Sequence, residues 1–90
     1  MRRDGQRLVL DGAATLDTHV ALRDAVTAEL NDGDLTIDWQ DVAAVDSSAL
    51  CLILHWQRTA AARGLEVFQE NLPVGLSALA ALYGIGELVA

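Results

Sequence analysis

Patterns typical of short strands alternate along this chain with patterns typical of amphipathic helices. A strand pattern over 6–11, ended by Gly12, precedes a helical pattern over 17–30. Strands that alternate with helices in this way predict an α/β layer fold. We therefore expect a single domain over residues 1–90, with a mixed or parallel sheet of about four strands covered by helices.

The helix predicted over 17–30 has an apolar stripe that repeats every four residues. Leu22, Val26 and Leu30 form this stripe, which should face the core. Val20 falls off the stripe, and the helical pattern gives no reason for an apolar side chain at that position.

The second half of the chain continues the alternation. The predicted elements are, in order, a strand over 35–39, a short extended piece over 42–45, a helix over 47–63, a strand over 66–69 and a helix opened by 71–73. Gly64 and Gly84 stand where the two helices should end. The apolar stripe of the last helix comprises Leu76, Leu79, Ala80 and Tyr83.

The chain is short and rich in aliphatic residues, with 52% hydrophobic but only 4% aromatic residues among its 90. A chain of this length buries only about 60–65% of its unfolded surface, so its core must be dense in apolar side chains. Leu, Val, Ile and Ala must supply most of that core. This apolar content excludes an intrinsically disordered chain.

The charge pattern limits the possible partners. The formal net charge is −7, with six arginines and no lysine, which opposes binding to nucleic acid or to an anionic membrane. Residues 1–46 carry ten acids and four arginines, whereas 47–90 carry three acids and two arginines. The longest clean apolar run is 49–54, well below the roughly 18 residues of a membrane span. Because the N-terminus also lacks the apolar stretch of a secretory signal, we expect a cytoplasmic protein without direct membrane insertion.

Reactive residue types are few and scattered. Cys51 is the only cysteine, and His19 and His55 stand 36 positions apart, so no disulfide, metal-ligand spacing or cofactor motif is expected. Ser47 and His55 lie about 12 Å apart along the predicted helix, too far for a nucleophile and its base. We predict no catalytic residue and no enzyme. A small hydrolase using Ser47 would need another base, such as His19, which nothing in the sequence orients.

The junction 45–50, with the sequence Val-Asp-Ser-Ser-Ala-Leu, stands at the start of the longest predicted helix. Asp46 and Ser47 can accept hydrogen bonds from the unpaired N–H groups of the first turn, and capping alone would account for them. The same place carries a partial positive charge, which tolerates a phosphate on a serine. The pattern leaves capping and modification both open.

This junction and its surroundings resemble the STAS domain, a family named for sulfate transporters and anti-sigma factor antagonists. The matching segments are Leu35-Thr36-Ile37-Asp38, Val42 and Val45-Asp46-Ser47-Ser48-Ala49-Leu50. Within the family, the chain looks most like the MlaB group, the small cytoplasmic subunits of Mla-type phospholipid ABC transporters. The segments similar to that group are Leu52-Ile53-Leu54-His55, Ala62-Arg63-Gly64 and Leu79-Ala80-Ala81-Leu82-Tyr83.

The resemblance implies roles for particular residues. Ser47 takes the position of the phosphorylatable Ser or Thr of regulatory STAS domains, and Asp46 is the acid before it. In the MlaB group, the Thr at the position of Ser47 is important for working with the transporter's ATPase. Ala49 stands where the regulators usually have Gly, and we expect its added methyl group to crowd the approach of a kinase or partner.

A helical wheel divides the helix over 47–63 into two faces. The side expected to pack on the sheet carries Leu50, Ile53, Leu54, Gln57 and Ala61. The opposite side carries Leu52, Trp56, Thr59 and Arg63, beside Cys51, His55 and Ala62. Because Leu and Trp are unusual together on a solvent-facing side, we predict a docking face centred on Leu52 and Trp56. The last helix or a second copy of the chain could cover that face instead.

We therefore predict a non-enzymatic STAS subunit that binds the ATPase of an Mla-type phospholipid ABC transporter, supports its assembly or activity, and so serves outer-membrane lipid asymmetry. It would be cytoplasmic and would reach the inner membrane through that partner. The predicted partner-binding residues are Asp46, Ser47, Ser48, Leu52, His55, Trp56 and Thr59. The alternative is an anti-sigma factor antagonist whose Ser47 is phosphorylated by a kinase that is also the anti-sigma factor.

Overall fold

The structure is a computed structural model and describes residues 1–82. Its strands form one four-stranded mixed sheet. Its strands, in spatial order, are β1 (Arg2–Asp4), β2 (Arg7–Ala14), β3 (Leu35–Val45) and β4 (Val67–Glu70). β1 runs antiparallel to β2, whereas β2, β3 and β4 run parallel. The predicted α/β class and mixed sheet are confirmed. The sequence patterns did not predict β1, because its three residues are all charged and show no apolar alternation.

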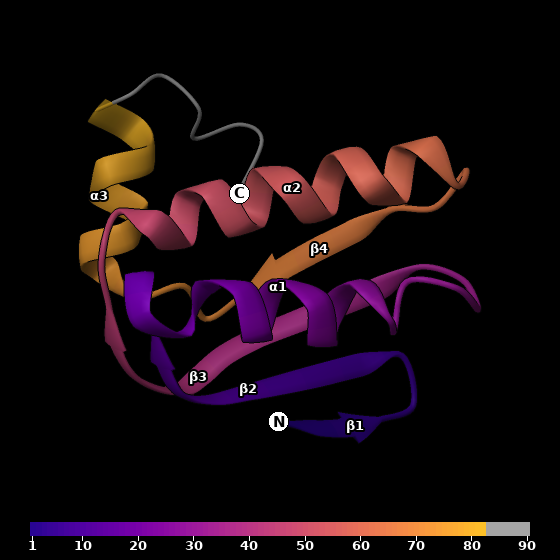
Figure 1. Cartoon of the computed structure of the whole chain (residues 1–90), viewed down its shortest axis with the longest axis horizontal. Helices are drawn as coiled ribbons and strands as arrows, with labels where there is room; N and C mark the ends of the chain where they lie inside the picture. The colour runs from indigo at the N-terminus through magenta and orange to yellow at the C-terminus, as the bar shows by residue number, and fades with distance from the viewer. Residues whose placement is uncertain (83–90) are drawn as a thin grey trace.

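The helices pack on the sheet and share one hydrophobic core with it. They are the 3-10 turn η1 (Leu16–Thr18) and the helices α1 (His19–Thr27), α2 (Ser48–Ala62) and α3 (Val74–Leu82). Figure 1 shows α1 and α2 side by side above the strands, with α3 standing across the beginning of α2. The start of α2 therefore lies beside the end of β2 and the beginning of η1 and α1.

The alternation of side chains along the strands determines which strand residues belong to the hydrophobic core. Leu8 and Leu10 of β2 and Ile37 and Trp39 of β3 are buried among the helices, because alternate side chains point to one face of a strand. The predicted stripe of α1 is confirmed, since Val26 and Leu30 are buried and Leu22 packs against the core. α1 itself ends at Thr27, and Leu30 lies in the turn that follows.

Two predicted boundaries in the sheet are wrong. β2 does not end at Gly12 but continues to Ala14, because Gly12 takes a φ of +68° within the strand, beside shifts in the pairing register. The pieces predicted over 35–39 and 42–45 form one strand, since Asp41 between them pairs with Asp11 of β2. The predicted boundaries of α2 are confirmed, and Gly64 follows its C-cap with a φ of +70°. For α3, Leu76 and Ala80 are buried as predicted, whereas Tyr83 and Gly84 lie outside the described residues.

The predicted docking face centred on Leu52 and Trp56 is wrong, because both side chains are completely buried. The side of α2 that carries them faces α1 and the core rather than solvent. The Trp56 indole N–H donates to the carbonyl oxygen of Arg23 in α1 at 3.3 Å, and its ring lies 6.3 Å from that of Trp39. Arg63, at the end of α2, likewise donates to the carbonyl oxygen of Leu30 at 2.7 Å. α2 is thus covered along two sides, by the sheet and by α1.

Candidate functional site

Asp46 joins three elements at the beginning of α2. One of its carboxylate oxygens accepts the backbone N–H of Leu16 at 3.0 Å, which ties η1 to the junction. The other accepts the backbone N–H of Ser48 at 2.9 Å and also the Ser48 hydroxyl. The backbone N–H of Asp46 donates to the carbonyl oxygen of Ala14 at the end of β2. Asp46 therefore fixes the position of η1 relative to α2.

The same contacts explain the charge state of Asp46. The hydrogen bond from the Ser48 hydroxyl, followed by that from the Leu16 N–H, lowers the pKa of the Asp46 carboxyl below its usual range. The proximity of His19 contributes in the same direction. Asp46 consequently carries a negative charge beside Ser47 at neutral pH.

Ser47 occupies the N-cap position of α2 but does not cap the helix through its side chain. Its backbone is already helical, with φ −63° and ψ −20°, whereas a capping serine usually adopts an extended backbone. Asp46 supplies the acceptor that the first turn requires. Ser47 itself is exposed, so its hydroxyl is presented to solvent at the beginning of a helix.

This division of roles predicts that Ser47 and Asp46 differ in their effect on stability. We expect Ser47→Ala to change the free energy of unfolding by less than about 0.5 kcal/mol, as for an ordinary surface residue. Asp46→Ala removes the acceptor of Leu16 and Ser48, so it should lower the urea midpoint measurably. Urea unfolding followed by circular dichroism compares the two variants. Equal midpoints for the two variants would show that Asp46 does not cap α2.

The other predicted site residues are only partly brought together with Ser47. Asp46, Ser47 and Ser48 form one cluster. His55 and Thr59 are half-buried on α2, and His55 lies about 12 Å along the helix axis from Ser47. His19, close enough to act on Asp46, makes no hydrogen bond to Ser47 within residues 1–82. These positions give Ser47 no oriented base.

Ala49 does not crowd the surface, contrary to our expectation. Its side chain is completely buried and belongs to the hydrophobic core. The methyl group that replaces the usual Gly hydrogen therefore points inward, away from the exposed Ser47. A kinase or partner that approaches Ser47 meets no added bulk from Ala49.

Two exposed apolar residues beside this cluster were not recognised from the sequence. Leu16 is 74% exposed and Val20 is 59% exposed, although both belong to the segment that Asp46 holds against α2. Val20 was detectable, since it fell off the apolar stripe of its helix. Leu16 gave no such signal, because it precedes the regular helix.

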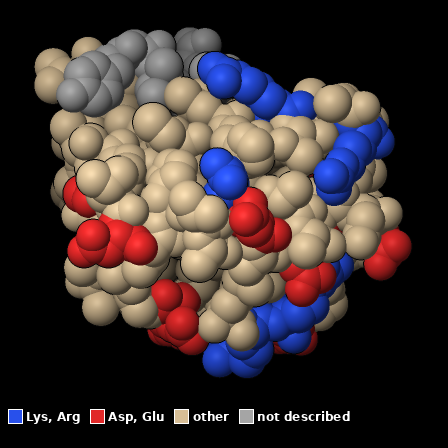
Figure 2. All heavy atoms as spheres, viewed as in Figure 1, with Lys and Arg blue, Asp and Glu red and all other residues tan. Residues whose placement is uncertain are grey.

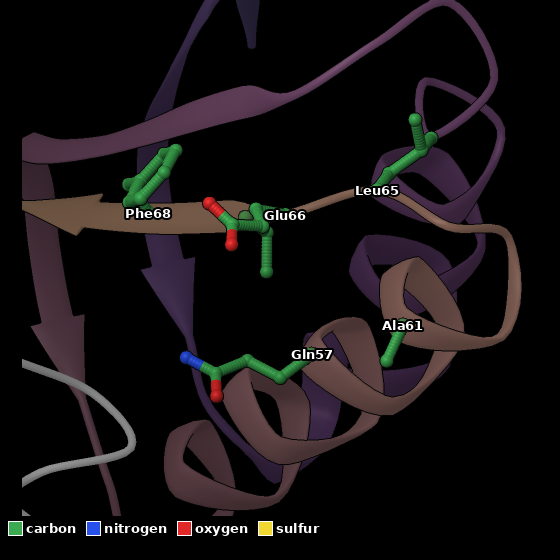
Figure 3. Close-up of a pocket in the computed structure, with 6 residues that line it drawn as sticks. Gln57, Ala61, Leu65, Glu66 and Phe68 are labelled. Carbon is green, nitrogen blue, oxygen red and sulfur yellow. The ribbon is translucent and has the colours of Figure 1, made fainter.

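A separate cavity of about 260 Å³ lies between α2 and β4. Its lining comprises Gln57, Ala61, Leu65, Glu66, Val67 and Phe68. Figure 3 shows Gln57 and Ala61 on α2 opposite Leu65, Glu66 and Phe68, which lie on β4 and on the segment that leads into it. The cavity begins at Gln57, ten residues beyond Ser47 and about 15 Å along α2, so it is not part of the Ser47 cluster.

Within residues 1–82, no group of three or more His, Cys, Asp or Glu side chains is placed to hold a metal ion. None of the described helices has the length and apolar character needed to cross a membrane. Cys51 is exposed on α2 as a free thiol.

Comparison with known proteins identifies the family of this chain. The family model described as "Mlab, STAS domain" matches residues 1–90. Among solved structures, the anti-sigma factor antagonist SpoIIAA in its unphosphorylated form has a similar fold, with a TM-score of 0.74 and 15% sequence identity. That similarity covers 93% of this chain and 76% of the other. Among curated proteins, no sequence matches the chain.

Proposed function

Because the chain belongs to the STAS domain family described by the Mlab model, we propose that it is a non-enzymatic subunit that binds the ATPase of an Mla-type phospholipid ABC transporter. The match of this model to residues 1–90 is the observation that carries the proposal. In this role the subunit would support assembly or activity of the transporter and so contribute to outer-membrane lipid asymmetry. It would be cytoplasmic and would reach the inner membrane through the ATPase.

The geometry around Ser47 supports a docking role. The side chain is exposed, its hydroxyl is not used as a helix cap, and a charged carboxylate lies next to it. A partner can therefore approach Ser47 without breaking a contact that stabilises α2. We propose Asp46, Ser47 and Ser48 as the centre of the contact, with His55 and Thr59 further along α2. Leu52 and Trp56 are excluded from it by their burial.

Ser47→Arg tests this proposal. A long charged side chain at the centre of the contact should weaken binding by about 100-fold, so that the variant no longer co-purifies with the Mla-type ATPase of the same organism. Ser77→Arg provides a matched control, because Ser77 is an exposed serine on α3. Both variants should retain the circular dichroism spectrum of the wild type. Co-purification of Ser47→Arg at the wild-type yield would contradict the proposal, as would a wild-type protein that does not bind the ATPase.

Anti-sigma factor antagonism is the second candidate, and the accessibility of Ser47 favours it. Phosphorylation would place a charge of about −1.5 to −2 beside Asp46 and would repel an acidic or apolar partner surface. Intact-mass analysis after incubation with a cognate anti-sigma factor kinase tests this candidate. We expect one added phosphate on the wild type and none on Ser47→Ala if the chain is such an antagonist. An unmodified wild type would exclude regulation by that kinase.

A further inference from the structure

An exposed apolar ridge formed by Leu16 and Val20 adjoins the Ser47 cluster. The two residues stand four positions apart, across η1 and the first turn of α1, which places them on the same side of this helical segment. Leu16 is 74% exposed and Val20 is 59% exposed. The hydrogen bond from the Leu16 N–H to Asp46 fixes the ridge next to Ser47. Single exposed apolar residues are common on protein surfaces, whereas adjoining ones mark a candidate protein contact.

Acidic side chains surround this ridge. Asp17 follows Leu16 and is exposed, Asp46 lies on the Ser47 side, and Asp24 stands one turn beyond Val20. Asp24 forms an ion pair with Arg23 at 3.1 Å, whereas Asp17 and Asp46 form no ion pair with a residue of the described part. In Figure 2 the visible charged side chains at the left, where α1 begins, are acidic, and the arginines lie away from that end. The ridge is thus apolar, with Asp17 and Asp46, unpaired within residues 1–82, at one end and the Arg23–Asp24 ion pair at the other end.

This combination points to the chemistry of the occupant. We infer that the ridge of Leu16 and Val20 binds a segment of the ATPase in which apolar side chains are flanked by Lys or Arg. The inference rests on the proposed function and specifies which surface of that partner makes the contact. Apolar burial supplies the affinity, while opposite charges at the border guide the encounter. A second copy of the chain fits less well, because two ridges that meet would bring Asp17 and Asp24 against the same acids of the other copy.

The test measures binding of the purified Mla-type ATPase from the same organism to variants of the full chain. Leu16→Asp and Val20→Asp should each weaken binding by about 10-fold to 100-fold. Each variant loses the apolar side chain that the partner would cover, and it places a carboxylate in the apolar centre of the contact. Val74→Asp is the matched control. Val74 is 86% exposed on α3, so this variant should bind within about twofold of the wild type.

A second measurement tests the acidic border. The Asp17→Asn and Asp24→Asn double variant should bind several-fold more weakly than the wild type at about 50 mM salt and nearly equally at about 500 mM, where the charges are screened. All variants change exposed residues, and circular dichroism checks their folding.

The outcomes separate the two proposals. If the wild type does not bind the ATPase, the proposed function and this inference both fail. If the wild type binds and both Leu16→Asp and Val20→Asp bind within about twofold of it, the ridge is not the contact, while the proposed function stands. Sedimentation that shows a dimer dispersed by Leu16→Asp would assign the ridge to a second copy and overturn the inference.

Discussion

Replacing Trp56 by glutamate is expected to unfold the domain rather than to disturb one surface of it. The indole is completely buried, contacts Trp39 and donates to the carbonyl oxygen of Arg23. Loss of a buried Trp side chain costs about 3–5 kcal/mol, and a buried carboxylate without a partner adds several more. A domain of this size is stable by only about 5–13 kcal/mol. The two costs together are comparable to the whole free energy of unfolding of the domain.

Circular dichroism and urea unfolding measure this effect. Arg58→Glu is the matched control, because Arg58 lies two residues further along α2 and is exposed. We expect Arg58→Glu to unfold near the wild-type midpoint and Trp56→Glu to lack a cooperative transition. A folded Trp56→Glu with a midpoint close to that of the wild type would show that Trp56 is not part of the core. Since Trp56→Glu should unfold, its loss of partner binding could not be taken as evidence for a docking face.

The second large effect is expected at Asp38, a buried carboxylate in β3. Its oxygens accept the Asn71 side-chain amide, the Gln40 backbone N–H and the Arg7 guanidinium, each at 2.9 Å. Asp38→Ala leaves the amide and the backbone N–H without this acceptor, while Arg7 retains its ion pair with Glu70. We expect a loss of about 2–3 kcal/mol in the free energy of unfolding, measured in urea. Asp41→Ala, at an exposed position of the same strand, should change it by less than about 0.5 kcal/mol.

The same contacts give this contribution a defined pH dependence. Burial raises the pKa of the Asp38 carboxyl, but the hydrogen bonds from Asn71, Gln40 and Arg7 outweigh it, so the pKa lies below the reference value of 3.8. A carboxyl with a depressed folded pKa stabilises the protein above its unfolded pKa and loses this effect as the pH falls through the folded value. The difference between wild type and Asp38→Ala should therefore be constant near neutral pH and shrink from about pH 4 downward. A difference that grows on acidification would contradict this assignment.

Much of the fold was predictable because it depends on local patterns. The boundaries of α2 followed from a long apolar helical pattern between Asp46 and Gly64, and both ends are as predicted. The cluster at 46–48 was predictable for the same reason, since an acid and hydroxyls before a helix have few local roles. The sequence could not show that Asp46, rather than Ser47, caps the helix. That choice depends on the backbone angles of Ser47 and on a contact with Leu16, thirty residues earlier.

The orientation of α2 was not predictable. A helical wheel locates apolar side chains around one helix, but it does not show how many neighbours cover that helix. The wheel placed Leu52 and Trp56 opposite the sheet, and it gave no indication that α1 covers that side. In the structure, α1 covers that side as well and accepts the hydrogen bond of Trp56.

The amino-acid sequence by itself determined the class of the fold, the order of most of its elements and the chemistry of the junction at 45–50. These properties arise from periodicity, capping and turn residues that act over a few positions. Tertiary structure alone decided which apolar side chains are core and which are surface: Trp56 is buried, whereas Leu16 and Val20 are exposed. Burial is a property of neighbours in space, and the packing of α1 against α2 brings those neighbours together from distant parts of the chain.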